Sequence, residues 1–241
     1  AIFHPMAHNV TDQDKNLQEQ LNRAHRELAV LYDISNAMRT TLELNHILYI
    51  ILTGVTAHTG LGFNRAILFL VNKKERCLEC KMAIGPDSGE QADKIWKYIK
   101  NANSDLEDLI ATDKISQTGR SSLYDSLKTL KIPLSNDGSL LASAFSNGSP
   151  LHIRREMMQQ YANDPLLSVF KTNELVIMPL KAKDNVNGLI VADNLYTQKP
   201  ITSDDLKIFM MLANQAGLAI ENSQLYEMVV HKSHTDSLTN I

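Results

Sequence analysis

The stretch LVIMPLKAKDNVNGLIVADN, residues 175–194, decides the fold of this chain. Its two ends, LVIMPLK and GLIVADN, are rich in β-branched and other apolar residues, as buried strands are. The polar run AKDNVN between them has the composition of a turn. Two such strands joined by a short polar turn pair antiparallel, so the stretch predicts a β-hairpin.

A second hairpin is predicted earlier in the chain. RAILFLV at 65–71 and RCLECKMAIG at 76–85 have the composition of strands, and NKKE at 72–75 separates them. Between the two hairpins, GSLLASAFSNGSPLHI at 138–153 predicts a short helix that ends at Asn147-Gly148, followed by an extended segment. The polar stretch 86–129 predicts a helical elaboration of the same domain.

Helices are also predicted before and after the strands. Residues 1–13 show no periodicity and are expected to form a disordered tail, whereas residues 14–40 predict a coiled-coil-like helix. The apolar positions of this helix recur in steps of four and three, as in a heptad pattern: Leu17, Leu21, Ala24, Leu28 and Leu31. The same pattern also suits an amphipathic helix that lies on its own domain. Near the other end, Thr202 and Asp205 form a capping box that opens a helix running to about His231.

Taken together, GSLLASAFSNGSPLHI, LVIMPLKAKDNVNGLIVADN and ANQAGLAIENSQLYE resemble a GAF domain, a relative of the PAS fold, over residues 41–226. The resemblance implies an α+β fold with an antiparallel sheet of five to six strands and flanking helices. It also implies a ligand pocket on one face of the sheet, and first and last helices that form a bundle and usually a homodimer. The interface positions expected from the two helices are Leu17, Leu21, Ala24, Leu28, Leu31, Leu212, Ala216 and Ala219.

The identity of a ligand stays open. The candidates for the pocket lie on or beside the predicted strands and the helix of the pocket wall: Phe69, Phe145, His152, Met157, Tyr161, Met178 and Asp193. No cofactor is required for the fold, although a small-molecule ligand, including haem held by His152, is compatible with the family. The alternative is a vestigial pocket, filled by the protein's own Phe, Met and Leu side chains, in a module that only dimerises.

Cys77 and Cys80 have the spacing of a redox or metal pair and leave a redox-active GAF domain as a further alternative. A metal site needs about four ligands, and residues three apart on a strand point to opposite faces, so no metal is expected. GAF domains that reduce free methionine sulfoxide use three cysteines, and this chain has two. The pattern of cyclic-nucleotide-binding members is incomplete, because only Asn72-Lys73 is present. A bilin would need a cysteine later in the domain.

TDSLTN at 235–240 is similar to the segment that begins GGDEF domains, with Asp236, Leu238 and Thr239 at matching positions. Asn240 stands where glycine is usual. Residues 227–241 are therefore expected to be a linker helix and the first residues of a GGDEF domain, the catalytic part of a diguanylate cyclase, which makes cyclic di-GMP. The GG-D/E-EF loop is not within residues 1–241, so no cyclase activity is expected from them.

Charge and hydropathy exclude several partners as defaults. The formal net charge of −3 gives no general attraction to nucleic acid or to anionic lipid. The longest apolar run, ILYIIL at 47–52, is far shorter than the ~20 residues of a transmembrane helix, and no signal peptide is recognisable. Two cysteines are too few for a disulfide framework. A cytoplasmic location is expected.

Overall fold

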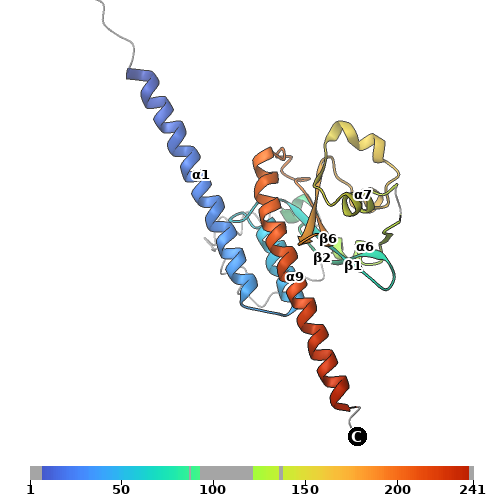
Figure 1. The fold of residues 1–241 in the computed structure, drawn as a ribbon. Coiled ribbons are helices and arrows are strands. Elements are labelled where there is room, and N and C mark those ends of the chain that lie inside the picture. The colour runs from blue at the N-terminus through green and yellow to red at the C-terminus, as the bar shows by residue number, and fades with distance from the viewer. Residues whose placement is uncertain (1–6, 87, 93–121, 136–137, 239–241) are drawn as a thin grey trace, which may run out of the picture.

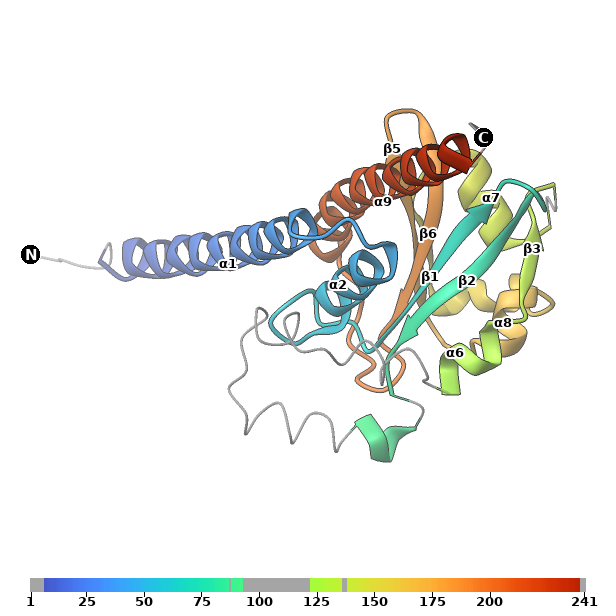
Figure 2. The ribbon, with the colours of Figure 1, turned by 90° about the horizontal axis from the view of Figure 1, so that it is seen from below.

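The segments with strand-forming composition assemble into one six-stranded antiparallel sheet (Figures 1 and 2). The structure, a computed structural model, describes residues 7–86, 88–92, 122–135 and 138–238. The strand order is β3-β2-β1-β6-β5-β4, and the prediction of five to six antiparallel strands is confirmed. The strands are β1 (Arg65–Asn72), β2 (Cys77–Ile84), β3 (Lys131–Pro133), β4 (Leu151–Ile153), β5 (Leu175–Ala182) and β6 (Asn185–Asp193).

Both predicted hairpins are confirmed, and they meet at the centre of the sheet, where β1 pairs with β6. The β5–β6 connection is short, because Ala182 pairs with Asn185. Lys183 adopts a left-handed φ of 55° in this turn, as tight hairpin turns require. Leu180 pairs with Gly188 but Lys181 pairs with Val186, so one residue of β6 is left without a partner. This β-bulge becomes important below.

The two faces of the sheet carry separate cores. Side chains alternate along β1, so that Leu68 and Leu70 face one cluster while Ile67 and Phe69 face the other. The first face is covered by α1 (Ala7–Arg39), α2 (Leu44–Thr56) and α9 (Ser203–Leu238) (Figure 2). The second face is covered by shorter elements: α6 (Ser122–Leu127), α7 (Leu140–Asn147), the 3₁₀ helix η1 (Arg155–Tyr161) and α8 (Pro165–Val169). We call these the helix face and the α7 face.

The long terminal helices pack on the domain over only part of their length. Leu31, Ile34 and Met38 of α1 are buried, whereas Leu17 and Leu28 nearer its start are 66% and 57% exposed. In Figure 1 the first half of α1 projects from one end of the domain and the last part of α9 projects from the other. The C-terminal part of α1 therefore lies on its own domain, as the amphipathic alternative predicts, while the coiled coil stays a prediction.

The boundaries of the helices differ from the expected ones at three places. α1 already begins at Ala7, because no Pro or Gly follows Pro5 in this region, so residues 7–13 are helical rather than a tail. α9 begins with the expected capping box, in which Thr202 and Asp205 exchange hydrogen bonds, and continues past His231 to Leu238. Of the helical elaboration expected at 86–129, the residues 93–121 lie outside the described part, which contains α6.

Candidate functional site

Four of the predicted pocket residues come together on the α7 face. Phe69 on β1 is fully buried there, and three half-buried side chains from α7 and η1 pack against the same cluster: Phe145, Met157 and Tyr161. The helix α7 forms as predicted and ends at Gly148, whose φ of 56° is the left-handed conformation of a helix C-cap. These four predicted residues thus share one cluster of the fold, and their role in ligand binding stays a prediction.

Met178 and His152 do not belong to this wall. Met178 is fully buried on the helix face, because its neighbour Ile177 on β5 occupies the α7 face and side chains alternate. His152 lies directly opposite Val176, a residue of the helix face, and its Nε2 is 2.7 Å from Glu174 Oε1. Its predicted role as a ligand or haem residue therefore has no support in its position.

The α7 face is filled by the protein's own side chains. Phe170 and Leu166 of the α8 region and Leu141 of α7 are fully buried, and they pack with Phe69 over the centre of the sheet. Dense apolar packing of this kind is what cores show. Over the described residues, this favours the alternative in which the inferred pocket is occupied by protein.

Asp193 has a structural partner instead of a ligand. It is fully buried at the end of β6 and pairs directly across the sheet with Arg65 of β1, whose Nε and Nη2 both donate to its carboxylate. The same guanidinium donates to the carbonyl of Lys171 and stacks 4.0 Å from the ring centre of Phe170. Both carboxylate oxygens therefore accept from Arg65, and the ion pair links the start of β1 to the end of β6.

Asp164 is a structural residue that sequence reasoning missed. Its carboxylate accepts from the backbone N–H groups of Leu166 at 2.8 Å and Leu140 at 2.7 Å, so one buried side chain caps α8 and holds the start of α7. The signal was available, because Asp followed by Pro is a common helix start.

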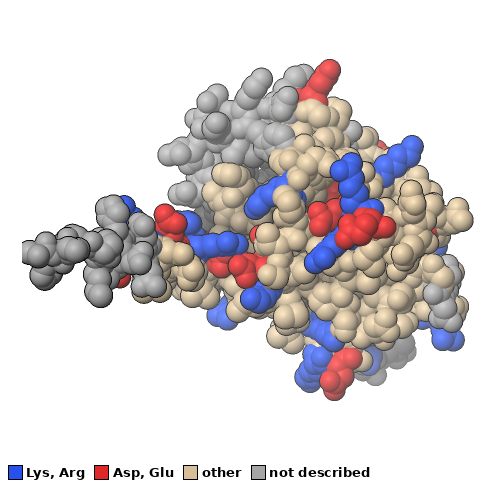
Figure 3. Space-filling view, turned by 90° about the horizontal axis from the view of Figure 1, so that it is seen from above, with Lys and Arg blue, Asp and Glu red and all other residues tan. Residues whose placement is uncertain are grey.

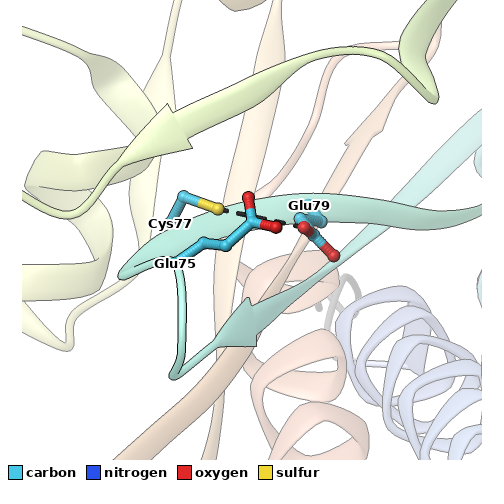
Figure 4. Close-up of side chains that lie close together, drawn as sticks. All are labelled: Glu75, Cys77 and Glu79. Atoms are coloured by element: carbon cyan, nitrogen blue, oxygen red, sulfur yellow. Dashed lines mark hydrogen bonds between the residues drawn. The ribbon is translucent and has the colours of Figure 1, made fainter.

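Glu75, Cys77 and Glu79 lie close together on the β1–β2 hairpin (Figure 4). Their potential ligand atoms lie within 4.8 Å of one another. Lysine side chains already neutralise these carboxylates: Lys131 forms ion pairs with both glutamates, and Lys81 Nζ lies 2.7 Å from Glu79. Hydrogen bonds from Lys81 and Asn72 lower the pKa of Glu79 to about 2.

These contacts make the cluster an ion-pair network that ties β3 to the hairpin. Basic and acidic side chains are similarly interspersed over the face shown in Figure 3.

The two cysteines do not form a working pair. Both are free thiols. Cys80 packs in the cluster of the α7 face. Cys77 instead hydrogen-bonds to Glu79, whose strand partner Leu70 lies on the helix face, so the two thiols face different sides of the sheet. Burial raises the pKa of Cys80 to about 12, and burial together with the charge of Glu79 raises that of Cys77. Thiolates are the reactive form, so this arrangement gives no support to the redox alternative.

The predicted dimer positions divide into two groups. Leu212 and Ala216 are fully buried in the core of the helix face, where no second chain can reach them, and Leu31 is buried there as well. Ala219 packs partly against the same core. Leu17, Leu21, Ala24 and Leu28 of α1 are exposed.

The reason for this division is that the heptad pattern of α9 has two apolar stripes. The stripe with the small residues faces the sheet, and the other stripe faces outward with Met211, Leu218 and Leu225, which are seven residues apart and each about half exposed at 48–49%. Of the predicted linker residues, Asp236 and Leu238 lie on the last turns of α9, and Thr239 lies outside the described part.

An open cleft lies at one end of the sheet. It has a volume of about 510 Å³ and lies between the end of β1, the C-terminal end of α7, the β5–β6 hairpin and Glu221 of α9. Phe145 is the one predicted pocket residue that lines it. Sequence analysis treated 182–187 as an ordinary turn and so missed the cleft.

Comparison with known families identifies the architecture. The family model described as GAF domain matches residues 43–220, which is most of the chain. This chain belongs to the GAF family. GAF domains are regulatory sensor modules of signalling proteins, and the α+β fold expected from the resemblance is confirmed.

Solved GAF structures share the fold at low sequence identity. The chain is similar to the GAF domain of a phosphoenolpyruvate-protein phosphotransferase from Coxiella burnetii, with 12% identity, a TM-score of 0.58 and coverage of 85% of this chain and 98% of that one. A fragment of a methyl-accepting chemotaxis protein has 16% identity, a TM-score of 0.55 and coverage of 80% and 98%.

A third similar structure is a free methionine-R-sulfoxide reductase from Neisseria meningitidis in complex with its substrate. It has 13% identity, a TM-score of 0.54 and coverage of 83% of this chain and 91% of that one. No significant match to a curated protein was found. Within the described part of the GAF chain, no helix combines the length and apolar character that crossing a membrane demands.

Proposed function

We propose that this GAF chain is the regulatory module of a cytoplasmic diguanylate cyclase and that α9 carries its signal to a GGDEF domain. The observation that supports this most is the course of α9, which covers the sheet and then continues as one helix into Asp236 and Leu238 of the GGDEF-like segment. A single helix that joins an input domain to an output segment can transmit a shift or rotation without a flexible joint.

Two contacts define where α9 leaves the domain. At Gly217 the helix approaches β5 so closely that a β-carbon there would lie 2.1 Å from the carbonyl oxygen of Lys181. Six residues later, the buried hydroxyl of Ser223 donates to the carbonyl of Leu42, in the connection between α1 and α2, at 2.7 Å. Beyond Ser223, apolar side chains such as Leu225 and Val229 are exposed. Movements of β5 and of the α1–α2 connection therefore both act on the start of the projecting segment.

The output that we propose needs two chains, because two cyclase domains, each holding one GTP, must meet face to face. The outward stripe of α9 supplies the contact, as heptad positions do in a parallel coiled coil. Leu21 and Leu28 of α1, also seven residues apart and about half exposed, pair with their counterparts at the other end of the domain. The four-helix arrangement is then limited to the stretch in which α1 and α9 lie side by side (Figure 1).

Leu225→Asp is expected to weaken dimerisation at least tenfold, since each charge would be buried against the other chain. Leu28→Asp should act in the same direction. Glu227→Lys and Glu19→Lys change the charge on exposed positions of the same helices that lie outside the two stripes and serve as matched controls. Sedimentation velocity over a range of concentrations measures the association. A monomer at tens of micromolar for the unmodified chain would contradict the stable dimer.

The transmission itself is tested with residues 1–241 joined to a catalytic GGDEF domain, assayed with GTP and Mg²⁺. Two residues inserted after Met228 rotate the distal helix by about 200°, whereas seven residues restore the heptad phase. The two-residue insertion is expected to change the rate of cyclic di-GMP formation roughly fivefold or more, in the range of ordinary allosteric coupling, and the seven-residue insertion by much less. Equal effects of the two insertions would exclude transmission through helix phase. Downstream coding sequence without a GG-D/E-EF loop would exclude the output.

The second candidate function is a dimerisation module with a vestigial pocket. The filled α7 face, with Phe69, Phe170 and Leu141 fully buried, favours it. The same helices would then hold two output domains together without responding to a ligand in that place. Both candidate functions predict the same result of the insertion experiment, because both place the output domains through α9. Binding of a ligand within the α7 face is expected only of the sensor and separates the two.

A further inference from the structure

The cleft at the end of the sheet has the size of a ligand site and lies at the border of the filled α7 face. Its volume of about 510 Å³ falls within the roughly 300–1,000 Å³ that small-molecule sites have. Its walls come from four elements that are distant in sequence: the end of β1, the C-terminal end of α7, the β5–β6 hairpin and α9. A molecule bound there would contact the sheet and the exit helix together.

Asn187 supplies an unsatisfied hydrogen-bond donor in the wall. It is the residue that the β-bulge leaves unpaired between Val186 and Gly188, and it is 9% exposed. Its amide nitrogen is buried and has no hydrogen-bond partner among the described residues. Buried polar groups are nearly always hydrogen-bonded, so the expected partner of this amide is an acceptor from outside the chain, either water or a ligand.

Four charged side chains surround the same cleft: Lys73, Lys181, Asp184 and Glu221. Within the described part of the chain, none of them takes part in an ion pair or a side-chain hydrogen bond. A β-carbon at Gly148 would lie 3.2 Å from Lys181 Nζ, so the glycine also leaves room for this ammonium group. The two lysines and the two carboxylates give the cleft no net charge. A ligand that carries only one sign of charge would be repelled by the pair of the same sign.

The apolar part of the wall is the half-buried ring of Phe145, with Val71 and Val186 beside it. An aromatic or aliphatic group can pack there at low cost, since these side chains already rest on the core. The geometry points to a binding site for a free amino acid with an apolar side chain: its carboxylate accepts from Asn187 and Lys181, and its ammonium group donates to Glu221. The binding inference stands on the cleft alone, whereas its regulatory meaning rests on the proposed function of α9.

L-phenylalanine is a suitable probe, with 3-phenylpropionate and phenethylamine as analogues that each lack one of its charged groups. Titration calorimetry on residues 1–241 is expected to show binding of phenylalanine below about 10 mM, at least tenfold tighter than either analogue. Lys181→Gln should weaken phenylalanine binding about tenfold, because a charge-assisted hydrogen bond is lost. Lys183→Gln, in the same hairpin but outside the cleft, is the matched control and should leave the affinity unchanged.

Glu221→Gln gives the sharpest result. It should remove the preference for phenylalanine over 3-phenylpropionate. The affinity for 3-phenylpropionate should stay within about twofold of its value for the unmodified chain. Equal binding of both compounds to the unmodified chain, or no binding of phenylalanine up to about 10 mM, would overturn the proposal. Because the readout is binding and not cyclic di-GMP, a failure here is distinct from a failure of the proposed output.

Discussion

Asp193→Ala is expected to lower the free energy of unfolding by about 3–5 kcal/mol, the usual cost of leaving one partner of a buried ion pair alone. The partner is Arg65, whose side chain is 8% exposed while that of Asp193 is 0% exposed. Arg65 cannot turn to water easily, because it also donates to the Lys171 carbonyl and is stacked on Phe170. Urea unfolding followed by circular dichroism measures the loss.

Two further variants separate the charge from the packing. Asp193→Asn keeps an acceptor for Arg65 and should cost less than the alanine variant. Replacing both partners by leucine removes both buried charges and should recover most of the stability, since apolar substitutes for buried ion pairs are often neutral. A loss below about 1 kcal/mol for Asp193→Ala would contradict the structural role and return Asp193 to the ligand-binding candidates.

Asp193 also shows what the sequence could not reveal. An acidic residue at the end of a strand is equally compatible with a ligand contact and with an ion pair, and the choice depends on Arg65, which is far away in the chain and reaches it through the pairing of β1 with β6. Local patterns determine where strands begin and end but not which strands become neighbours. The ends of the two hairpins were therefore predictable, and the family resemblance implied that they share one antiparallel sheet, but the pairing of β1 with β6 was not predicted.

The face of each side chain was predictable only where the strand register was known. Met178 lies one residue from Ile177, and the period of two puts it on the opposite face, yet both residues are apolar and fully buried. In a central strand that is covered on both faces, composition does not distinguish one face from the other. The same difficulty explains Leu212 and Ala216, because α9 is apolar on two sides.

The cleft around Asn187 was beyond sequence reasoning for a different reason. A β-bulge shifts the register by one residue without changing the composition, so KAKDNVN has the appearance of a plain turn. The unpaired amide becomes visible only when the pairing of Lys181 with Val186 is known.

Gly217→Ala is the second substitution expected to have a large effect, a loss of about 1–3 kcal/mol in the free energy of unfolding from overpacking. The new methyl group would lie 2.1 Å from the carbonyl oxygen of Lys181 and 2.6 Å from its nitrogen, and a backbone that is fixed in a hairpin cannot move aside as a side chain can. The loss is expected even though alanine is favoured over glycine inside a helix by up to ~1 kcal/mol. Thermal and urea unfolding measure it.

Gly54→Ala is the matched control, because Gly54 also lies inside a helix and gains the same propensity. Its new methyl group would meet the Ile34 side chain, at 2.4 Å from Cδ1 and 2.9 Å from Cγ1, and a side chain can shift more easily than a backbone. Gly54→Ala should therefore cost clearly less than Gly217→Ala, and equal costs would show that the backbone contact of α9 with β5 is not tight.

In the fused cyclase, Gly217→Ala is also expected to push α9 away from β5, the strand that borders the cleft. If the signal passes through this contact, the effect of saturating phenylalanine on cyclic di-GMP formation should be lost in the variant.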